Sequence, residues 1–360
     1  MFKFYSVLLC LIFNSQVISQ GLTHIADLPI SLKESSGLLY LNNSVISIND
    51  SGNDPNLYSV NPITGNILRE VNIANANNVD WEDLAMDESF IYIGDFGNNN
   101  GNRTDLKIYK ISINDYLLND TVSSEVIEFS FSDQLDFNQN PFATNHDAEA
   151  LIAYGDSLYV FTKNWIDSKC NVYSVAKDPG SFVVSKIDSF NTNGYVSAAD
   201  FNVDDSTVII SSYDFNSAKL IELKNFKKGQ FFSGSITNHQ LIPLTGYSIQ
   251  FEGVCFENST NYFISSEQFL NDKSALYSFL SPTNNLEEEA FKLPEIFPNP
   301  SSGIIYFQNL NNEKVVIKDL LGNTLRVTTE NYVDLSALPK GIYYCYFQSS
   351  HTQITKLILQ

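Results

Sequence analysis

The stretch WEDLAMDESFIYIGDF, residues 81–96, places a carboxylate between a tryptophan and an apolar run, and a second apolar run follows after a short polar turn. Two short apolar segments joined in this way are typical of a β-hairpin. The pattern recurs in SSGLLY (35–40), AEALIA (148–153), VSAADF (196–201) and FEGVCF (251–256), which are followed by VISIND, LYVFTK, VIISSY and YFISSE. The opening stretch is therefore one unit of an internal repeat.

The repeat continues beyond these two segments. A third segment, usually with an aromatic residue, follows in each unit, and the first four units add a fourth, ILREVNI, VIEFSF, FVVSKID or HQLIPL. Four short strands repeated along a chain predict a β-propeller. The fifth unit has no fourth strand of its own, and we expect THIADLPI (23–30) to supply it and close the ring. The sequence thus predicts an all-β fold with a five-bladed propeller, and a sixth blade within residues 112–146 is the alternative.

Charge and targeting signals restrict the class of protein. The formal net charge is −20, from 41 acidic and 21 basic residues, and such a field repels the phosphates of nucleic acids. Residues 1–19 have the pattern of a secretory signal peptide, with Lys3 ahead of the apolar run SVLLCLIF. No later stretch is long and apolar enough for a transmembrane segment. The sequence predicts an exported protein that favours cations as partners.

The second residue of each repeat, which we call its anchor, predicts a metal site. The first strand of a propeller blade lines the central channel, so the anchors should face one another. Three carboxylates in one channel repel unless they are protonated or hold a cation. Ca²⁺ accepts oxygen ligands, whereas zinc prefers His or Cys. We therefore expect Ca²⁺; a water-filled channel with raised carboxyl pKa values is the alternative. The anchors are Ser36, Glu82, Glu149, Ser197 and Glu252.

At these anchors the chain resembles the calcium-activated nucleotidases, or soluble apyrases. That family is a five-bladed propeller whose single Ca²⁺ is held by a ring of Ser, Glu, Glu, Ser and Glu, in the order found here. The resemblance spans about residues 23–282 and implies the same ion. It does not extend to the nucleotide-contacting residues, because NDSGN, GDFGNNNGNR and TKNW do not map onto them.

Polar residues at the ends of the second segments are the candidates for chemistry, because these ends should meet at one mouth of the channel. Asp50 and Asp95 are the candidate general bases toward water. Arg103 and Lys163 would hold an anionic group of the substrate. The alternative is that both loops are ordinary turns, since Asn, Asp and Gly favour them. The full set of candidate substrate-binding residues is Asn49, Asn53, Asn98, Asn99, Arg103, Lys163 and Glu267.

The predicted propeller region spans residues 20–282 and is followed by a polar linker at residues 283–291. After the linker the sequence changes character. Residues 292–360 carry FPNPSSG, DLLGN, DLSALPKGIYY and TKLIL, and about six short strands with turns at Ser302–Gly303 and Gly322–Asn323 predict a small β-sandwich. These motifs closely resemble the type A C-terminal sorting domain of the type IX secretion system of Bacteroidetes. The resemblance implies that the secretion machinery is a partner and that the protein is secreted or held at the cell surface.

Two functions fit these observations. The first is a secreted Ca²⁺-dependent hydrolase of a phosphoester, a phosphoanhydride or a related small anionic substrate. The second is a non-catalytic extracellular propeller in which Ca²⁺ is structural and the rim binds a glycan or a protein, since one fold hosts many activities.

Overall fold

The computed structural model describes residues 22–214, 217–243, 250–268, 272–281, 295–308, 314–320, 322–348 and 353–360. The predicted signal peptide and linker lie outside the described residues. The chain forms two compact units, Met1–Pro282 and Thr283–Gln360. No helix among the described residues is long and apolar enough to cross a membrane.

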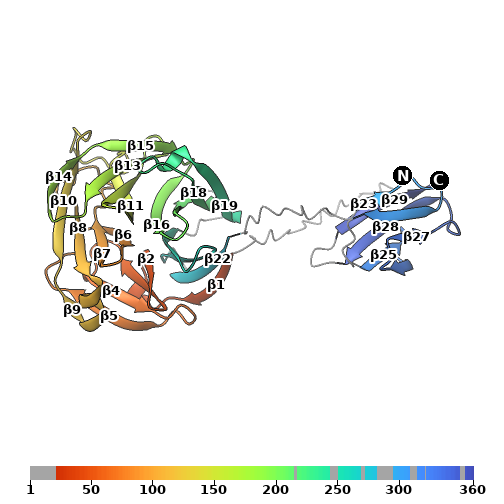
Figure 1. The fold of residues 1–360 in the computed structure, drawn as a ribbon, viewed down its shortest axis with the longest axis horizontal. Helices are drawn as coiled ribbons and strands as arrows, with labels where there is room; N and C mark the ends of the chain where they lie inside the picture. Colours follow the sequence, from red (N-terminus) through yellow and green to blue (C-terminus); the bar gives the residue numbers. More distant parts are fainter. Residues whose placement is uncertain are drawn as a thin grey trace, which may run out of the picture. The chain divides into compact units, whose positions relative to one another are not determined.

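The described residues of the first unit form five sheets that follow one another around a centre (Figure 1). Four strands of each sheet pair antiparallel, and two of the sheets add a fifth strand that pairs in parallel. The first sheet has the order β2 (Ser35–Leu41), β3 (Ser44–Asn49), β4 (Asn56–Val60), β5 (Ile67–Ile73), β9 (Thr121–Val122), and the second has the order β6 (Trp81–Met86), β7 (Phe90–Asp95), β8 (Lys107–Ser112), β10 (Glu125–Phe131), β14 (Gly180–Val184). The third has the order β11 (Asp147–Tyr154), β12 (Ser157–Lys163), β13 (Lys169–Ala176), β15 (Lys186–Asn191). The fourth has the order β16 (Tyr195–Asn202), β17 (Thr207–Tyr213), β18 (Ser217–Lys224), β19 (Ser235–Pro243), and the fifth has the order β20 (Phe251–Phe256), β21 (Asn261–Ser266), β22 (Ala275–Leu280), β1 (Leu22–Asp27).

The ring closes as the repeat predicts. Strand β1, from the start of the described chain, pairs antiparallel with β22 near the end of the unit, with Thr23 opposite Ser278. The described part of the 112–146 connection forms no separate sheet. Its short helix α1 (Ile113–Leu118) is followed by β9, which pairs with β5, and by β10, which pairs with β8. This connection therefore extends two neighbouring sheets.

One predicted strand is wrong in its boundaries. The segment FVVSKID was expected to be a single fourth strand of the third unit. In the structure β14 pairs in parallel with β10 of the previous sheet, and only β15 completes the third sheet beside β13. The segment thus bridges two sheets, because its first half meets the exposed edge of β10.

Apolar clusters fill the spaces between neighbouring sheets. Ile48 and Ile93 belong to the cluster between the first and second sheets, and Val45 and Phe263 belong to the one between the first and fifth. Similar clusters join the second sheet to the third, the third to the fourth, and the fourth to the fifth. Because every sheet is buried on both faces, its inner strands read as short apolar runs, and burial of this surface is the main stabilising term.

The C-terminal unit is a small two-sheet structure with its own core. One sheet has the order β23 (Glu295–Phe297), β24 (Ile304–Gln308), β27 (Tyr332–Asp334). The other has the order β26 (Thr324–Thr328), β25 (Lys314–Lys318), β28 (Gly341–Gln348), β29 (Gln353–Leu359). Ile305 of the first sheet and Ile317 and Cys345 of the second share one apolar cluster, which is the arrangement of a sandwich.

Candidate functional site

The five inner strands β2, β6, β11, β16 and β20 share an irregularity near their first residues. The antiparallel register shifts at or next to each anchor. Glu82, Glu149, Ser197 and Glu252 are the residues left without a cross-strand partner, whereas in β2 the extra residue is Gly37, directly after Ser36. A β-bulge redirects the side chain at the extra residue. At this level of the ring, the bulges therefore release the anchor side chains from the regular alternation between the two faces of a strand.

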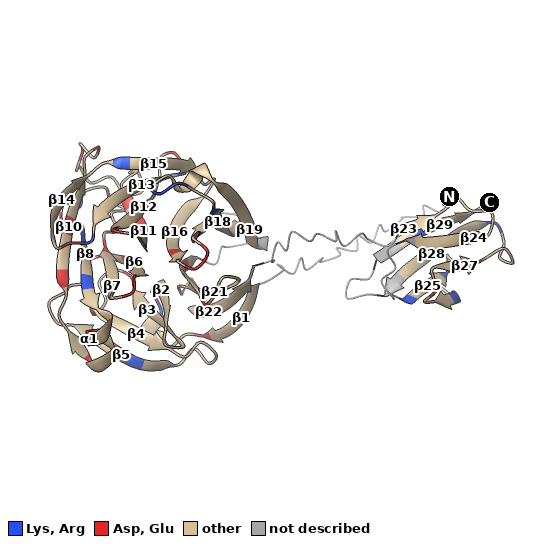
Figure 2. Ribbon diagram, viewed as in Figure 1, with Lys and Arg blue, Asp and Glu red and all other residues tan. Residues whose placement is uncertain are grey.

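Four of the five anchors line a cavity of about 170 Å³. Loops near the centre of the ring carry acidic residues (Figure 2), and the cavity wall includes Asp50 and Glu267 at the ends of second strands. The residues predicted from the repeat that line it are Ser36, Glu82, Glu149, Glu252, Asp50, Asn99, Lys163 and Glu267. The sequence pattern therefore brings together eight of the residues that line a single cavity.

The two serine anchors bind backbone carbonyls of neighbouring inner strands. The Ser197 hydroxyl is fully buried and donates to the carbonyl oxygen of Phe251 at 2.5 Å, and Ser197 does not line the cavity. The Ser36 hydroxyl donates to the carbonyl of Glu82 and lies 3.3 Å from that of Glu252. Both serines thus connect adjacent inner strands in this structure.

Lys163 supplies a positive charge inside the cavity. Its Nζ lies 3.1 Å from Glu149 Oε1, and the side chains are only 8% and 5% exposed. Burial opposes the charge on Lys163, but the surrounding carboxylates, Glu149 first among them, outweigh burial and raise the lysine pKa well above its ordinary value. The ammonium also lies 5.1 Å from the centre of the Trp165 ring. One predicted calcium ligand is therefore already paired with a cation of the chain itself.

Near this pair, three carboxylates lie close enough to one another to share one ion. One oxygen each of Asp50, Asp80 and Glu82 lies within 4.8 Å of the others. Ca²⁺ binds oxygens at about 2.3–2.6 Å, so its ligands on opposite sides lie about 5 Å apart, and the observed spacing fits. Gly97 makes room for the group, since a methyl group there would lie 2.0 Å from Glu82 Oε1 and 2.5 Å from Asp80 Oδ2. The all-oxygen set of this acidic trio suits Ca²⁺.

Burial and mutual repulsion hold several of these carboxyl groups partly protonated. Burial, with the charges of Asp50 and Asp147, raises the pKa of Asp80 to about 7. Burial, with Asp50, raises the pKa of Glu267 to about 7. Burial is also the main cause that raises the pKa of Glu252 to about 8. In the metal-free protein these groups bind protons more tightly than in the unfolded chain.

This shift predicts the pH dependence of the metal-free protein. The carboxyl groups have a pKa of about 4 in the unfolded chain and higher values in the folded protein. Between these values the folded state binds more protons than the unfolded state, so the free energy of unfolding should fall as pH rises from about 5 to 8. Each group contributes at most about 1.4 kcal/mol per pH unit. Thermal melts in a chelator across this range measure the slope. A melting temperature that rises steadily to pH 8 would contradict the arrangement.

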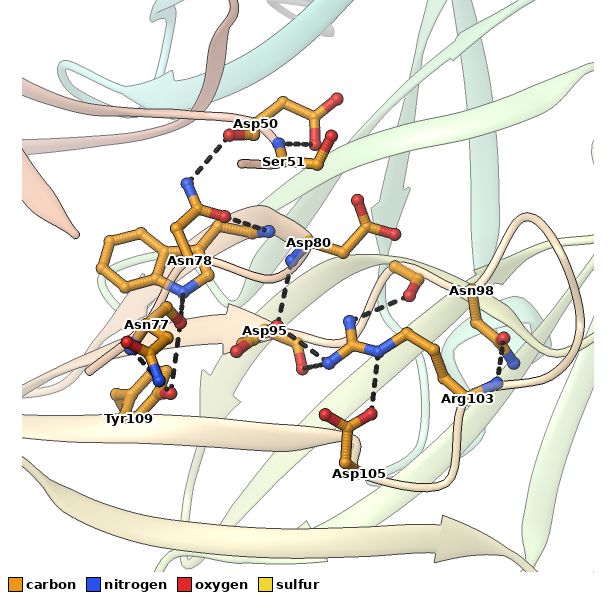
Figure 3. Close-up of polar contacts among 12 residues, drawn as sticks. Asp50, Ser51, Asn77, Asn78, Asp80, Asp95, Asn98, Arg103, Asp105 and Tyr109 are labelled. Atoms are coloured by element: carbon orange, nitrogen blue, oxygen red, sulfur yellow. Dashed lines mark hydrogen bonds and ion pairs between the residues drawn. The ribbon is translucent and has the colours of Figure 1, made fainter. Parts of the chain in front are cut away.

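Asp95 and Arg103 lie outside the cavity wall and bind each other. Arg103 Nη2 is 2.9 Å from Asp95 Oδ1, and its Nε is 3.1 Å from Asp105 (Figure 3). The same Asp95 oxygen accepts the backbone N–H of Asp80 at 3.1 Å. Asp95 is fully buried. This placement favours a structural role in which Asp95 and Arg103 position the Asp80 backbone, and it does not support Asp95 as a base or Arg103 as an anion ligand.

The predicted amide residues divide into loop-forming and cavity-lining ones. Asn49 donates to the Ser31 carbonyl oxygen at 2.7 Å, and Asn98 holds its own loop by accepting from the Arg103 N–H at 2.9 Å. Asn53 donates to Glu34 Oε2 at 2.6 Å. Only Asn99 of this set lines the cavity. The turn interpretation therefore describes most of these asparagines in the structure.

Sequence reasoning missed two acidic residues that shape the site. Asp80 belongs to the acidic trio, and its position two residues before the anchor Glu82 was the available signal. Asp83 follows the same anchor and is fully buried, with Oδ2 accepting the backbone N–H of Leu151 at 2.8 Å and of Ala199 at 3.0 Å. Both lie within two residues of the anchor Glu82, but the repeat alignment compares only the anchor position itself.

The fold and the site together define a β-propeller-like ring of sheets with an acidic channel mouth, joined to a small β-sandwich. Residues 295–360 match the family described as a secretion system C-terminal sorting domain. This match confirms the prediction for the tail, and the tail marks the protein for export by the type IX machinery to the medium or the cell surface. No match was found among curated proteins.

Two solved structures that resemble this chain are distant in sequence. A PQQ-bound aldose sugar dehydrogenase from Streptomyces coelicolor is 9% identical, with 73% of this chain and 99% of that chain covered and a TM-score of 0.40. A nidogen/laminin complex is 12% identical, with 69% and 86% covered and a TM-score of 0.39. At these scores neither likeness carries an argument about function.

Proposed function

We propose that the exported protein is a five-bladed propeller, one blade per sheet, that binds Ca²⁺ at the channel mouth between Asp50, Asp80 and Glu82. The acidic trio carries the proposal, because its oxygens converge within 4.8 Å beside a glycine that leaves room for them. Glu149, by contrast, is already paired with Lys163. The trio therefore replaces the ring of five anchors as the expected ligand set, and Glu82 belongs to both.

The size of the cavity supports an ion-centred site. About 170 Å³ is below the roughly 300–1,000 Å³ of pockets that enclose drug-sized ligands. The cavity can hold an ion with a few waters, and a larger ligand would present only one group to it. The carboxylates also repel one another when they ionise, and a divalent cation removes that repulsion.

Calcium should raise the melting temperature of the full chain. At a calcium concentration 100 times Kd the folded state gains about 2.7 kcal/mol, which corresponds to about 5–10 °C for a domain of this size. Glu82→Gln should abolish most of the shift because it removes a charged ligand, whereas Ser36→Ala should reduce it only slightly. The measurement is a set of melts with added Ca²⁺ or a chelator, together with metal analysis.

Asp54→Asn is the matched control for this experiment. Asp54 is exposed in the loop that follows Asp50, and its loss removes one negative charge away from the trio. The proposal predicts that this variant keeps the full calcium shift. Absence of bound calcium and of any shift in the unmodified protein would overturn the proposed site.

Hydrolysis of an anionic substrate is the second candidate. It is favoured by one observation, that Asp50 and Lys163 line the same cavity. Asp50 would act as general base toward water while Lys163 binds an anionic group. The non-catalytic alternative assigns Ca²⁺ a structural role and places ligand binding on the rim.

Activity assays separate these two functions. If the protein is a hydrolase, Asp50→Asn should lower turnover by about 10²–10⁴, with bound calcium measured in the same samples because Asp50 is also a proposed ligand. Asp95→Asn should affect stability more than turnover, since Asp95 is paired with Arg103. The substrates are a panel of nucleotides and phosphoesters. A calcium-loaded protein that hydrolyses none of them would favour the binding function.

A further inference from the structure

A second and larger cavity lies at the opposite ends of the inner strands. Its volume is about 910 Å³, within the range of sites that enclose small molecules. Residues from the last part of all five inner strands contribute to its wall, namely Tyr40, Met86, Tyr154, Phe201 and Phe256. It is therefore coaxial with the ring and faces away from the acidic trio.

The middle of the inner strands separates the two cavities. A methyl group at Gly37 would lie 2.8 Å from the Cα of Asp83, so β2 and β6 touch through their backbones. The Asp83 carboxylate is fully buried and accepts N–H groups from β11 and β16. A molecule bound in the larger cavity therefore does not reach Glu82.

The wall of the larger cavity combines aromatic rings with an excess of carboxylates. Tyr40, Tyr154 and Phe201 are partly exposed and line it. The carboxylates that line it are Asp87, Glu88, Asp178, Asp200, Asp204 and Glu257. Four of them, Glu88, Asp178, Asp204 and Glu257, are exposed to solvent. The excess of negative charge attracts cations.

The two lysines of the wall are already engaged. Lys110 Nζ is 3.2 Å from Glu125 and 4.1 Å from the centre of the Phe90 ring. Lys177 Nζ is 2.8 Å from Asp87 and 5.7 Å from the centre of the Tyr92 ring. Each lysine ammonium group is therefore held between a carboxylate and an aromatic face. Neither lysine offers an unpaired charge to an anion.

We propose that this cavity binds a small organic cation, a molecule that carries an ammonium or guanidinium group on an apolar body. The exposed carboxylates attract the charge, and the aromatic faces bind a cation through the quadrupole of the ring. The apolar part of the wall buries the body of the ligand. The proposal does not depend on calcium at the other mouth of the channel.

Calorimetric titration of the full chain with three probes tests the proposal. Choline, agmatine and spermidine represent a quaternary ammonium, a guanidinium and a polyamine, and 3,3-dimethyl-1-butanol is the uncharged isostere of choline. We expect at least one cation to bind and choline to bind more tightly than its isostere. Higher salt should weaken the binding, because exposed charges are screened.

Charge variants locate the site. The double variant Asp204→Asn/Glu257→Gln should weaken cation binding by about tenfold, since each of the two exposed carboxylates should contribute about threefold. Asp205→Asn, at an exposed neighbour outside the wall, should leave it unchanged, as should Glu82→Gln in the smaller cavity. The proposal is overturned if no cation binds, if the isostere binds as tightly as choline, or if Asp205→Asn or Glu82→Gln weakens binding as much as the double variant.

Discussion

Deleting residues 292–360 should leave the ring of sheets folded and stop the protein from reaching the medium. The two units are compact separately, with the division after Pro282. The strand that closes the ring, β1, pairs with β22 inside the first unit, and the apolar cluster of the tail consists only of residues of the tail. The truncated chain therefore keeps all its inter-sheet clusters and loses the sorting domain that marks it for export.

The measurement is the distribution of the protein between periplasm and medium for the full and truncated chains. We expect almost complete retention of the truncated chain, with a melting temperature of the first unit changed by no more than about 2 °C, the equivalent of a neutral surface change. Fusion of residues 292–360 to an unrelated periplasmic protein is the positive control and should send that protein to the medium. A truncated chain that fails to fold, or that is still released, would contradict the division into two independent units.

The repeat made the order of the strands and the closure of the ring predictable. Two apolar runs joined by a polar turn indicate a buried hairpin, and the chain has five of them. The fifth repeat lacks a fourth strand of its own, and β1 supplies it. The length of the 112–146 connection suggested a further blade because sequence does not reveal pairing partners. In the structure β9 and β10 pair with the edges of sheets that already exist.

The contacts of the site were less predictable because they depend on the bulges and on side chains distant in sequence. Glu82 and Glu149 occupy the same position of the repeat, yet Glu82 joins Asp80 and Asp50, whereas Glu149 pairs with Lys163. Asp50 and Asp95 also end equivalent strands. Asp95, however, pairs with Trp81, the residue before its anchor, as Asn49 pairs with Ser35, so Asp95 corresponds in register to Asn49 and not to Asp50. Its buried carboxylate binds Arg103.

Lys163→Met should be among the most destabilising single substitutions in the protein. It leaves the Glu149 carboxylate buried without its ion-pair partner at 3.1 Å, and loss of one member of a buried pair typically costs about 3–5 kcal/mol. For a domain of this size that lowers the melting temperature by about 6–20 °C. Burial already raises the pKa of Glu149 well above its ordinary value, although the charge of Lys163 lowers it. The loss should be larger at pH 8 than at pH 5, since without Lys163 the pKa of Glu149 rises further and protonation at low pH removes the unpaired charge.

Thermal melts of a double-mutant cycle in chelator measure this effect. Lys163→Met/Glu149→Gln should recover most of the lost stability, because replacing both members of a buried pair by neutral groups is often close to neutral. Lys169→Met is the matched control: Lys169 is 49% exposed and lies 3.8 Å from Asp167, so its loss should change stability by no more than about 0.5 kcal/mol. Added calcium should stabilise Lys163→Met more than the unmodified protein, because the ion then supplies the only positive charge in a more negative cavity. If Lys163→Met melts like the unmodified protein at both pH values, Lys163 does not balance the carboxylates of the channel mouth.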